Sequence, residues 1–245
     1  MPPTARADNP RMTIRALTLD LDDTLWPLLP TLLRAERAMH DWLAEHAPAT
    51  ARMHGIDAMR ELRAEVGRRH PGLAHDLSQL RRVSLLEALR AAGDDPALAE
   101  PAFDAFFDAR QQVVFYDEVA DALDRLASRH RLLAVSNGNA DLAATGLSRW
   151  FAGSVSARQA GVAKPDPRIF HQACAALDCA PDAVMHVGDD HAADIVGARA
   201  AGLHSAWLRR EPERVGRIEI DPCAPSGHHW VIGDLTVLAD RLLAD

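Results

Sequence analysis

Two groups of aspartates stand at places in the chain where a single acid would be ordinary. Asp20 and Asp22 directly follow one short apolar segment, and Asp189, with Asp194 shortly after it, follows another. A helix cap or a turn would explain one acid in each group. It would not explain the others, because unpaired carboxylates crowded at a strand end repel each other unless protons or a cation compensate. Mg²⁺ prefers oxygen ligands and typically takes one or two carboxylates, so these acids predict a magnesium site.

Ser136, Asn137 and Lys164 are candidates for binding an anion near these acids. Ser136 and Asn137 form an ordinary turn with Gly138, but their hydroxyl and amide groups could equally hold a phosphoryl oxygen. Lys164 stands before Asp166, which is predicted to cap a helix whose first residue is a proline. The cap gives no reason for Lys164, which is therefore either a solvated surface charge or a ligand of the same anion.

The segments that must position these side chains alternate between strands and helices. Short apolar runs typical of buried strands, with one more strand expected near Val155, occupy residues 14–19, 132–135, 184–187 and 205–208. Helical patterns fill the later intervals, and this alternation predicts an α/β fold, a Rossmann-like parallel sheet with helices on both faces. Ligands bind such sheets at the carboxyl ends of the strands, where the polar groups stand.

One long interval contains no candidate strand. Residues 27–112 carry apolar side chains at helical spacing, interrupted by prolines and glycines, and predict about four helices. We therefore expect an α/β core domain of residues 1–26 and 113–245, with residues 27–112 inserted as an all-helical cap domain. The end of the chain is expected to form a loop, a short strand and a closing helix over residues 211–229, 230–232 and 235–243.

The polar groups, in this order, resemble the four sequence motifs of the haloacid dehalogenase superfamily. The matching segments are Asp-x-Asp-x-Thr at residues 20–24, Ser136, Lys164, and Gly-Asp at 188–189 with the later Asp194. This set is similar to that of the family's phosphatases, and a helical insert between the first two motifs resembles the subclass with a cap at that place. The resemblance implies a magnesium-dependent phosphatase that acts on a small phosphorylated metabolite.

The resemblance also implies a role for each matched residue. Asp20 would be the nucleophile that forms an aspartyl phosphate. Asp22 would be the general acid and then the base, and it would have to start neutral, with a proton favoured by its acidic neighbours. Mg²⁺ would be held by the carboxylates of Asp20 and Asp189 and the backbone carbonyl of Asp22, with Asp194 just outside the direct ligands. The other substrate-site residues would be Thr24, which orders the loop, Ser136, Asn137 and Lys164.

Within the family, the chain is similar to bacterial phosphatases that act on 5-amino-6-(5-phospho-D-ribitylamino)uracil in flavin biosynthesis. The likeness lies in residues 19–26, 136–140, 186–190 and 206–208, and in residues 71–93 of the insert. Two other functions stay open. A 2-haloacid dehalogenase would need no metal, but dehalogenases of this family lack an aspartate at the place of Asp22. A non-catalytic phospholigand-binding protein would be expected to have a damaged motif.

Composition limits the partners and the compartment. The chain of 245 residues has a net charge of −8 at pH 7 and no basic stripe, so no nucleic-acid partner is expected. Its three cysteines have no disulfide or metal-ligand spacing. Neither an export signal nor an apolar run of about 20 residues is visible. These features predict a cytoplasmic protein without a membrane partner, either a monomer or a homodimer.

Overall fold

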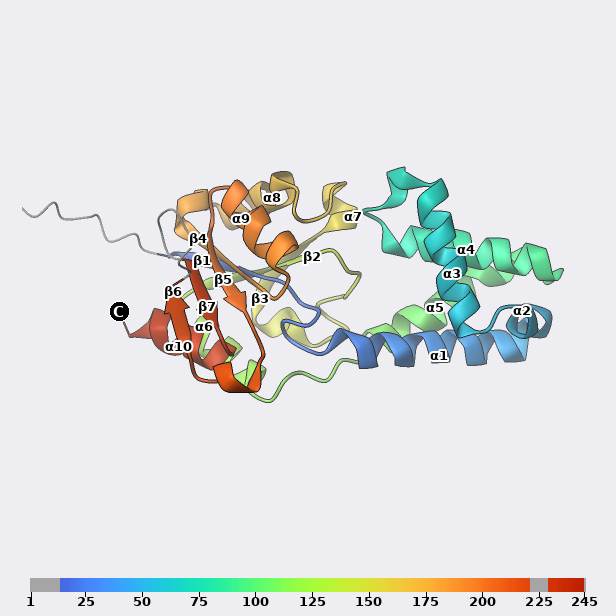
Figure 1. The fold of residues 1–245 in the computed structure, drawn as a ribbon, viewed down its shortest axis with the longest axis horizontal. Helices are drawn as coiled ribbons and strands as arrows, with labels where there is room; N and C mark the ends of the chain where they lie inside the picture. Colours follow the sequence, from blue (N-terminus) through green and yellow to red (C-terminus); the bar gives the residue numbers. More distant parts are fainter. Residues whose placement is uncertain (1–13, 221–228, 245) are drawn as a thin grey trace, which may run out of the picture.

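The computed structural model describes residues 14–220 and 229–244, which form an α/β core with a group of helices beside it (Figure 1). The core is built on a seven-stranded sheet with the strand order β3-β2-β1-β4-β5-β7-β6. Its strands are β1 (Ala16–Leu19), β2 (Arg131–Ser136), β3 (Phe151–Ser156), β4 (Val184–Gly188), β5 (His204–Leu208), β6 (Ile218–Ile220) and β7 (His229–Ile232). The predicted fold class is confirmed, and each strand expected from an apolar run is present.

The central strand β1 lies between β2 and β4 and runs parallel to both. Leu19, its last residue, lies opposite Ala134 of β2 and Val187 of β4. The chain leaves β1 toward β2 on one side and later returns to β4 on the other, so the strand order reverses at β1. In an open parallel sheet, the crevice at the carboxyl ends of the strands on either side of such a reversal is the usual ligand site.

The expectation of a loop over residues 211–229 is wrong at two places. β6 lies within this segment and pairs antiparallel with β7, and His229 is the first residue of β7. β6 has only three residues, of which Glu219 and Ile220 are exposed. It therefore lacks the apolar burial by which the other strands were predicted, and backbone pairing with β7 holds it in place. Residues 221–228 of the expected loop lie outside the described residues.

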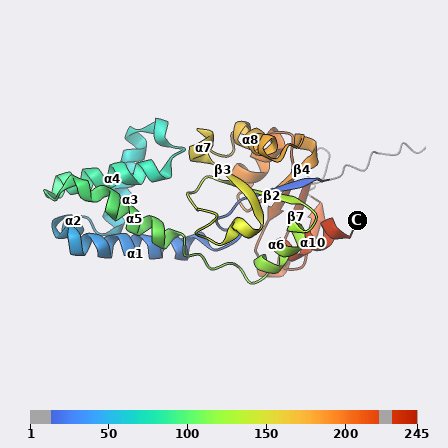
Figure 2. The same cartoon turned by 180° about the vertical axis from the view of Figure 1, so that it is seen from behind.

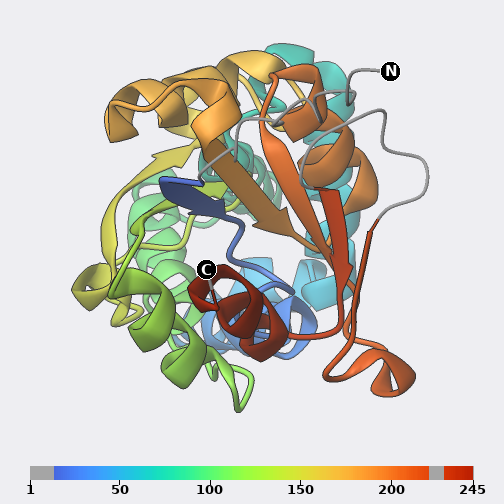
Figure 3. The same ribbon diagram turned by 90° about the vertical axis from the view of Figure 1, so that its left-hand side faces the viewer.

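Helices cover both faces of the sheet (Figure 3). α6 (Val119–Ala127) and α10 (Leu235–Leu243) pack on one face, and α8 (Pro167–Leu177) and α9 (Gly197–Ala200) pack on the other. Because both faces are covered, strand residues are apolar on both sides: Leu17 belongs to the cluster under α6, and Ala16 to the cluster under α8. The closing helix predicted over residues 235–243 is confirmed by α10.

Five of the six α-helices between β1 and β2 lie together on one side of the core (Figures 1 and 2). They are α1 (Leu28–His46), α2 (Pro48–Met53), α3 (Ile56–Arg69), α4 (Leu77–Ala92) and α5 (Ala99–Arg110), and together they are called the helical insert below. The expectation of about four helices was too low, because Pro48 does not only interrupt a helix but also begins the separate short helix α2. No helix in the described part of the chain is long and apolar enough to cross a membrane.

The helical insert has an apolar core of its own and joins the α/β core next to the end of β1. Side chains of α1, α4 and α5, among them Leu43, Leu85 and Phe106, form a cluster separate from those of the sheet. The backbone N–H of Tyr116, on the returning segment, donates to the carbonyl of Leu25 at 3.0 Å. The outgoing and returning segments are therefore hydrogen-bonded to each other where they cross between insert and core.

Candidate active site

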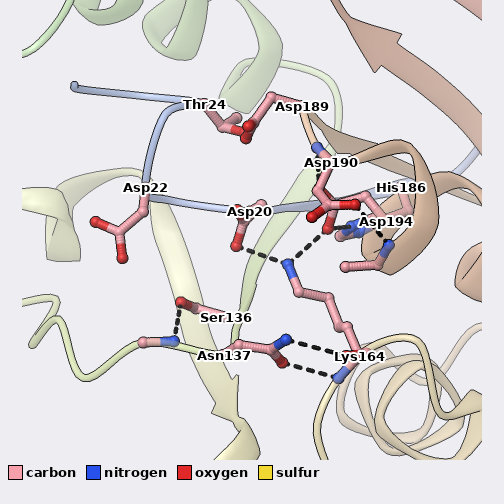
Figure 4. A network of polar contacts seen from close by, with 12 residues as sticks. Asp20, Asp22, Thr24, Ser136, Asn137, Lys164, His186, Asp189, Asp190 and Asp194 are labelled. Atoms are coloured by element: carbon pink, nitrogen blue, oxygen red, sulfur yellow. Dashed lines mark hydrogen bonds and ion pairs between the residues drawn. The ribbon is translucent and has the colours of Figure 1, made fainter. Parts of the chain in front are cut away.

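The ends of three neighbouring strands bring the predicted site residues together (Figure 4). Asp20 follows β1, Ser136 ends β2, and Asp189 follows β4. Because these strands are parallel and in register, the three side chains stand at one edge of the sheet. The sequence-based prediction that the polar groups meet at the carboxyl ends of the strands is therefore confirmed by the geometry.

Lys164 reaches this edge from the loop between α7 (Ala157–Ala160) and α8. It is buried, with 5% of its surface exposed, and its Nζ donates to Asp20 Oδ1 and to Asp194 Oδ1, each at 2.6 Å. The side chain of Asn137 holds the Lys164 backbone from both sides, accepting from its N–H at 2.8 Å and donating to its carbonyl at 3.0 Å. Lys164 is thus not a solvated surface charge, and Asn137 positions it.

The composition of the chain gives a second indication, independent of the motif, that Lys164 has a specific role. Of the 27 basic residues in the sequence, 26 are arginine and Lys164 is the single lysine. A chain that uses arginine at its other basic positions has a specific reason to keep a lysine here. A lysine places a compact positive charge between two carboxylates, whereas a guanidinium is broader and planar.

Asp20, Asp189 and Asp194 form a compact group of acids. One oxygen of each lies within 4.8 Å of the others, and Asp194 is fully buried. Thr24, also fully buried, donates its hydroxyl to Asp189 Oδ1 at 2.8 Å and so fixes the orientation of Asp189. This donor set consists of hard oxygen ligands, which fits a divalent cation such as Mg²⁺ and does not fit a softer metal.

The electrostatics of these acids call for more positive charge than Lys164 supplies. Burial raises the pKa of Asp20 to about 8, with Asp194 and Asp22 adding to the rise and Lys164 opposing it. Burial likewise raises the pKa of Asp189 to about 6, against the hydrogen bond from Thr24. Burial alone would raise the pKa of Asp194 too, but Lys164 and His186 together lower it. Lys164 contacts two of the three carboxylates, Asp20 and Asp194, and a proton or a cation is needed to compensate the remaining charge.

His186 of β4 and the backbone of Asp190 hold the side chain of Asp194 in place. The Nε2 of His186, a fully buried residue of β4, lies 3.1 Å from Asp194 Oδ1, and its Nδ1 lies 2.9 Å from the hydroxyl of Thr18. The backbone N–H of Asp190 donates to Asp194 Oδ2 at 3.0 Å. A Cβ on Gly188 would lie 2.2 Å from the Asp194 side chain, so only glycine allows this approach at the end of β4. Both oxygens of Asp194 are thus engaged by protein groups.

Asp22 has partners that its sequence context did not reveal. Trp26 Nε1 donates to its Oδ1 at 2.9 Å, and Arg110 Nη2 donates to both carboxylate oxygens, at 2.6 and 2.7 Å. These hydrogen bonds fix the orientation of the Asp22 side chain. Arg110 is the last residue of α5, 88 positions away in the chain, and no local pattern around it signals this contact.

The core residues and the helical insert line an open cavity of about 340 Å³ between them. On the core side it is lined by predicted site residues, namely Asp20, Asp22, Ser136, Asn137, Lys164, Asp189 and Asp194. On the insert side its polar lining comes from arginines, Arg63, Arg81 and Arg110. Thr24 does not line this cavity, because its hydroxyl lies beneath Asp189. The volume of this cavity suits a small phosphorylated molecule.

The sequence and the fold of the chain are also similar to those of known proteins. The family model for haloacid dehalogenase-like hydrolases matches residues 14–202. The chain is 33% identical to the 5-amino-6-(5-phospho-D-ribitylamino)uracil phosphatase of Escherichia coli over 81% of this chain and 84% of that protein. It is 31% identical to the phosphoserine phosphatase of Thermus thermophilus over 80% of this chain and 89% of that protein. Among solved structures, one described as a 2-haloacid dehalogenase from Pseudomonas syringae superposes with a TM-score of 0.82 at 34% identity, covering 95% of this chain and 99% of that one.

Proposed function

Because the chain belongs to the haloacid dehalogenase-like hydrolase family, we propose that it is a Mg²⁺-dependent phosphatase that passes the phosphoryl group of a small metabolite through Asp20. The observation that carries this proposal is the position of Lys164. Its charge, 2.6 Å from both Asp20 and Asp194, stands where a phosphoryl group entering the cavity would need it. Phosphoryl transfer depends mainly on positioning and on neutralising the charge of the phosphoryl oxygens.

Each residue of the site has a place in the proposed reaction. Asp20 attacks phosphorus, the bond from phosphorus to the ester oxygen breaks, and the phosphoryl group stays on the Asp20 carboxylate. Asp22 gives a proton to the departing oxygen. It then takes a proton from the water that attacks the aspartyl phosphate, which releases inorganic phosphate and restores Asp20. Lys164 and Ser136 hold the phosphoryl oxygens during both transfers.

The metal would be bound by the carboxylates of Asp20 and Asp189 and the backbone carbonyl of Asp22. Asp194 would not be a direct ligand of the metal. Its Oδ1 is occupied by Lys164 and His186, and its Oδ2 by the backbone N–H of Asp190. When bound, Mg²⁺ supplies positive charge that screens the attacking carboxylate from the phosphoryl oxygens. The chain's own residues orient both groups and exclude water around them.

We expect the stabilisation of the protein by Mg²⁺ to increase with pH. Without metal, the raised pKa values of Asp189, about 6, and Asp20, about 8, favour protonated carboxyls in the folded state. Their contribution to folding is therefore full below their ordinary pKa near 3.8 and is lost as the pH rises through about 6 and about 8. Over the same range the protons leave and the cation can replace them. Thermal melts with and without MgCl₂ should show a larger rise in Tm at pH 8.5 than at pH 5.5, and a rise independent of pH would contradict the assignment.

Replacing Asp22 with Asn should slow the hydrolysis of esters with poor leaving groups most. An alkoxide needs a proton to depart, whereas a nitrophenolate departs readily without one, and general acid catalysis contributes about 10²–10⁴-fold. We expect kcat/KM, which reports the first transfer and not the later attack of water, to fall at least about 10²-fold for an alkyl phosphate such as O-phosphoserine, and much less for 4-nitrophenyl phosphate. Equal losses for both esters would count against Asp22 as the proton donor.

We propose 5-amino-6-(5-phospho-D-ribitylamino)uracil as the first substrate to test, on the strength of the Escherichia coli relative. The test is a phosphate-release screen that includes this compound, O-phosphoserine and glyceraldehyde 3-phosphate, the three esters named by relatives. We expect release with MgCl₂ and a loss of at least nine-tenths of it with EDTA. Activity that survives EDTA in full, or no release from any ester, would refute the proposal.

A second candidate function, hydrolysis of a carbon–halogen bond, is suggested by the Pseudomonas syringae structure described as a 2-haloacid dehalogenase. It would use Asp20 as nucleophile but would need neither a proton donor for the halide nor a metal. The presence of Asp22 and of the acid group around Asp189 favours the phosphatase instead. Halide release from a 2-haloacid in the presence of EDTA would reverse this order.

We also propose that residues 27–112 act as a cap domain over a core of residues 1–26 and 113–245. The separate apolar cluster of the helical insert and the paired crossing at Leu25 and Tyr116 support this division. Closure of such a cap would exclude water from the cavity.

A further inference from the structure

Arg110 has a hydrogen-bond donor in the active site that nothing in the described structure uses. Its side chain is buried, with 2% of the residue exposed, and its Nη2 is committed to Asp22. Its Nη1 is also buried and has no hydrogen-bond partner among residues 14–220 and 229–244. A buried donor left unpaired costs about 1–3 kcal/mol, so such a group is expected to meet an acceptor when the site is in use.

The position of Arg110 determines which part of a substrate could supply that acceptor. Lys164 and Ser136, on the core side of the cavity, are the donors placed for the phosphoryl oxygens. Asp22 must lie beside the ester oxygen if it is to give that oxygen a proton. Arg110 approaches Asp22 from the helical insert, on the opposite wall of the cavity. The group within its reach therefore belongs to the alcohol that leaves, not to the phosphoryl group.

The charges on the insert wall favour an oxygen acceptor. Arg81 is buried, its guanidinium lies 3.5 Å from the centroid of the Phe106 ring, and the acid nearest to it among its ion pairs, Glu36, is 3.9 Å away. Glu36 is shared with two more arginines, Arg60 at 2.5 Å and Arg63 at 3.4 Å. Arg60 also pairs with Asp57 at 2.7 Å, so two carboxylates serve three guanidinium groups, which leaves an excess of positive charge at this wall. Carbonyl and carboxylate oxygens are the acceptors that such a wall attracts.

We propose that Arg110 is a specificity-determining residue that binds a carbonyl or carboxylate oxygen of the leaving group through Nη1 while Nη2 holds Asp22. This inference rests on the proposed phosphatase function. Because one guanidinium would contact both the leaving-group oxygen and Asp22, it would align the leaving group with its proton donor. Esters whose alcohol carries such an oxygen would be preferred over esters whose alcohol carries none.

The test compares three esters in the wild type and in variants of Arg110. O-phosphoserine presents a carboxylate, 5-amino-6-(5-phospho-D-ribitylamino)uracil presents neutral carbonyl oxygens, and phenyl phosphate presents no acceptor beyond the ester oxygen. Arg110→Met removes both donors, and Arg110→Lys keeps a positive charge near Asp22 but cannot span two acceptors. Arg82→Met is the matched control, since Arg82 stacks on Phe103 and pairs with Glu100 away from the cavity.

We expect Arg110→Met to lower kcat/KM for at least one acceptor-bearing ester about 10- to 100-fold more than for phenyl phosphate, which is the range for a hydrogen bond to a charged group. Arg110→Lys should retain most activity on phenyl phosphate and show the same selective loss. The ester with the larger fall in kcat/KM identifies the acceptor that Arg110 binds, a carboxylate for O-phosphoserine or a carbonyl for 5-amino-6-(5-phospho-D-ribitylamino)uracil. Equal losses on all three esters would mean that Arg110 acts only on Asp22, and would overturn the proposal.

A binding measurement keeps the inference separate from the proposed function. In an Asp20→Asn background, calorimetry gives the Kd of O-phosphoserine, of 5-amino-6-(5-phospho-D-ribitylamino)uracil and of phenyl phosphate with and without Arg110→Lys. Weaker binding of at least one of the first two ligands, with phenyl phosphate unchanged, would support the subsite even if no ester released phosphate in the screen. Unchanged Kd values for all three ligands would overturn the subsite while the phosphatase proposal stood.

Discussion

Asp20→Asn should reduce phosphate release by at least about 10⁴-fold, because this replacement removes the nucleophile while it keeps the shape of the side chain. The amide nitrogen or oxygen of Asn is too weak a nucleophile to attack phosphorus at a useful rate. Asp20 Oδ1 accepts from Lys164 at 2.6 Å, and an amide oxygen can accept the same hydrogen bond. The measurement is single-turnover phosphate release with O-phosphoserine and with the flavin precursor.

The fold should survive this change. Burial and two neighbouring acids raise the pKa of Asp20 to about 8, so a neutral amide at this place relieves repulsion rather than creating it. We expect the Tm of metal-free Asp20→Asn at pH 8.5 to be no lower than that of the wild type. Asp166→Asn is the matched control: the same chemical change at the cap of α8, where Asn caps as well as Asp, should leave turnover intact. Residual activity of Asp20→Asn above about a hundredth of wild type would exclude it as nucleophile.

Lys164→Met should lower kcat about 10³-fold, which is the upper end of the loss found when one preorganised donor to a developing negative charge is removed. Met has a similar length and can fill the buried space, but it leaves the phosphoryl oxygens without their fixed positive charge. Lys164 is the one lysine or arginine that pairs with Asp20 and Asp194 in the described part of the chain, and the variant removes its charge. Taking one partner out of a buried ion pair typically destabilises a protein by about 3–5 kcal/mol.

The response of the Tm to MgCl₂ shows whether Lys164→Met has lost only a charge or has lost the structure of the site. Asp20 and Asp189 remain in Lys164→Met, so MgCl₂ should still raise the Tm, and by more than in the wild type, because the cation meets less competition. Steady-state kinetics and thermal melts measured on the same sample make the comparison. A variant that turns over as fast as wild type, or one in which MgCl₂ no longer changes the Tm, would contradict the assigned role.

The sheet and its catalytic edge could be predicted from the sequence because their signals are local. A strand buried on both faces, such as β1 or β4, appears as a short apolar run, and the acids that follow it mark its carboxyl end. The expectation that these strand ends meet came from the rule for parallel sheets and from the resemblance to the family. The same approach missed β6, in which only Ile218 packs against the apolar core and the backbone pairs with β7, and it did not count α2 as a separate helix.

Arg110 and the engaged state of Asp194 could not be predicted in this way. Arg110 looks like an ordinary basic residue in the last turn of a helix, and only the fold brings it to Asp22, 88 positions earlier. The contacts of Asp194 with His186 and Lys164 likewise depend on distances between elements far apart in the chain. The side chains that contact a motif residue are determined by tertiary packing, whereas the motif itself can be recognised in the sequence.

The single lysine of this sequence also makes the site chemically addressable. Lys164 is the only side chain in the 245 residues that carries a primary amine, and it lies buried between two carboxylates. An acylating reagent with a mass tag would therefore report, through the labelling of one side chain, how often the pocket becomes accessible. Ligands that keep the pocket shut could be ranked by the protection they give, with no need for turnover or for an engineered probe.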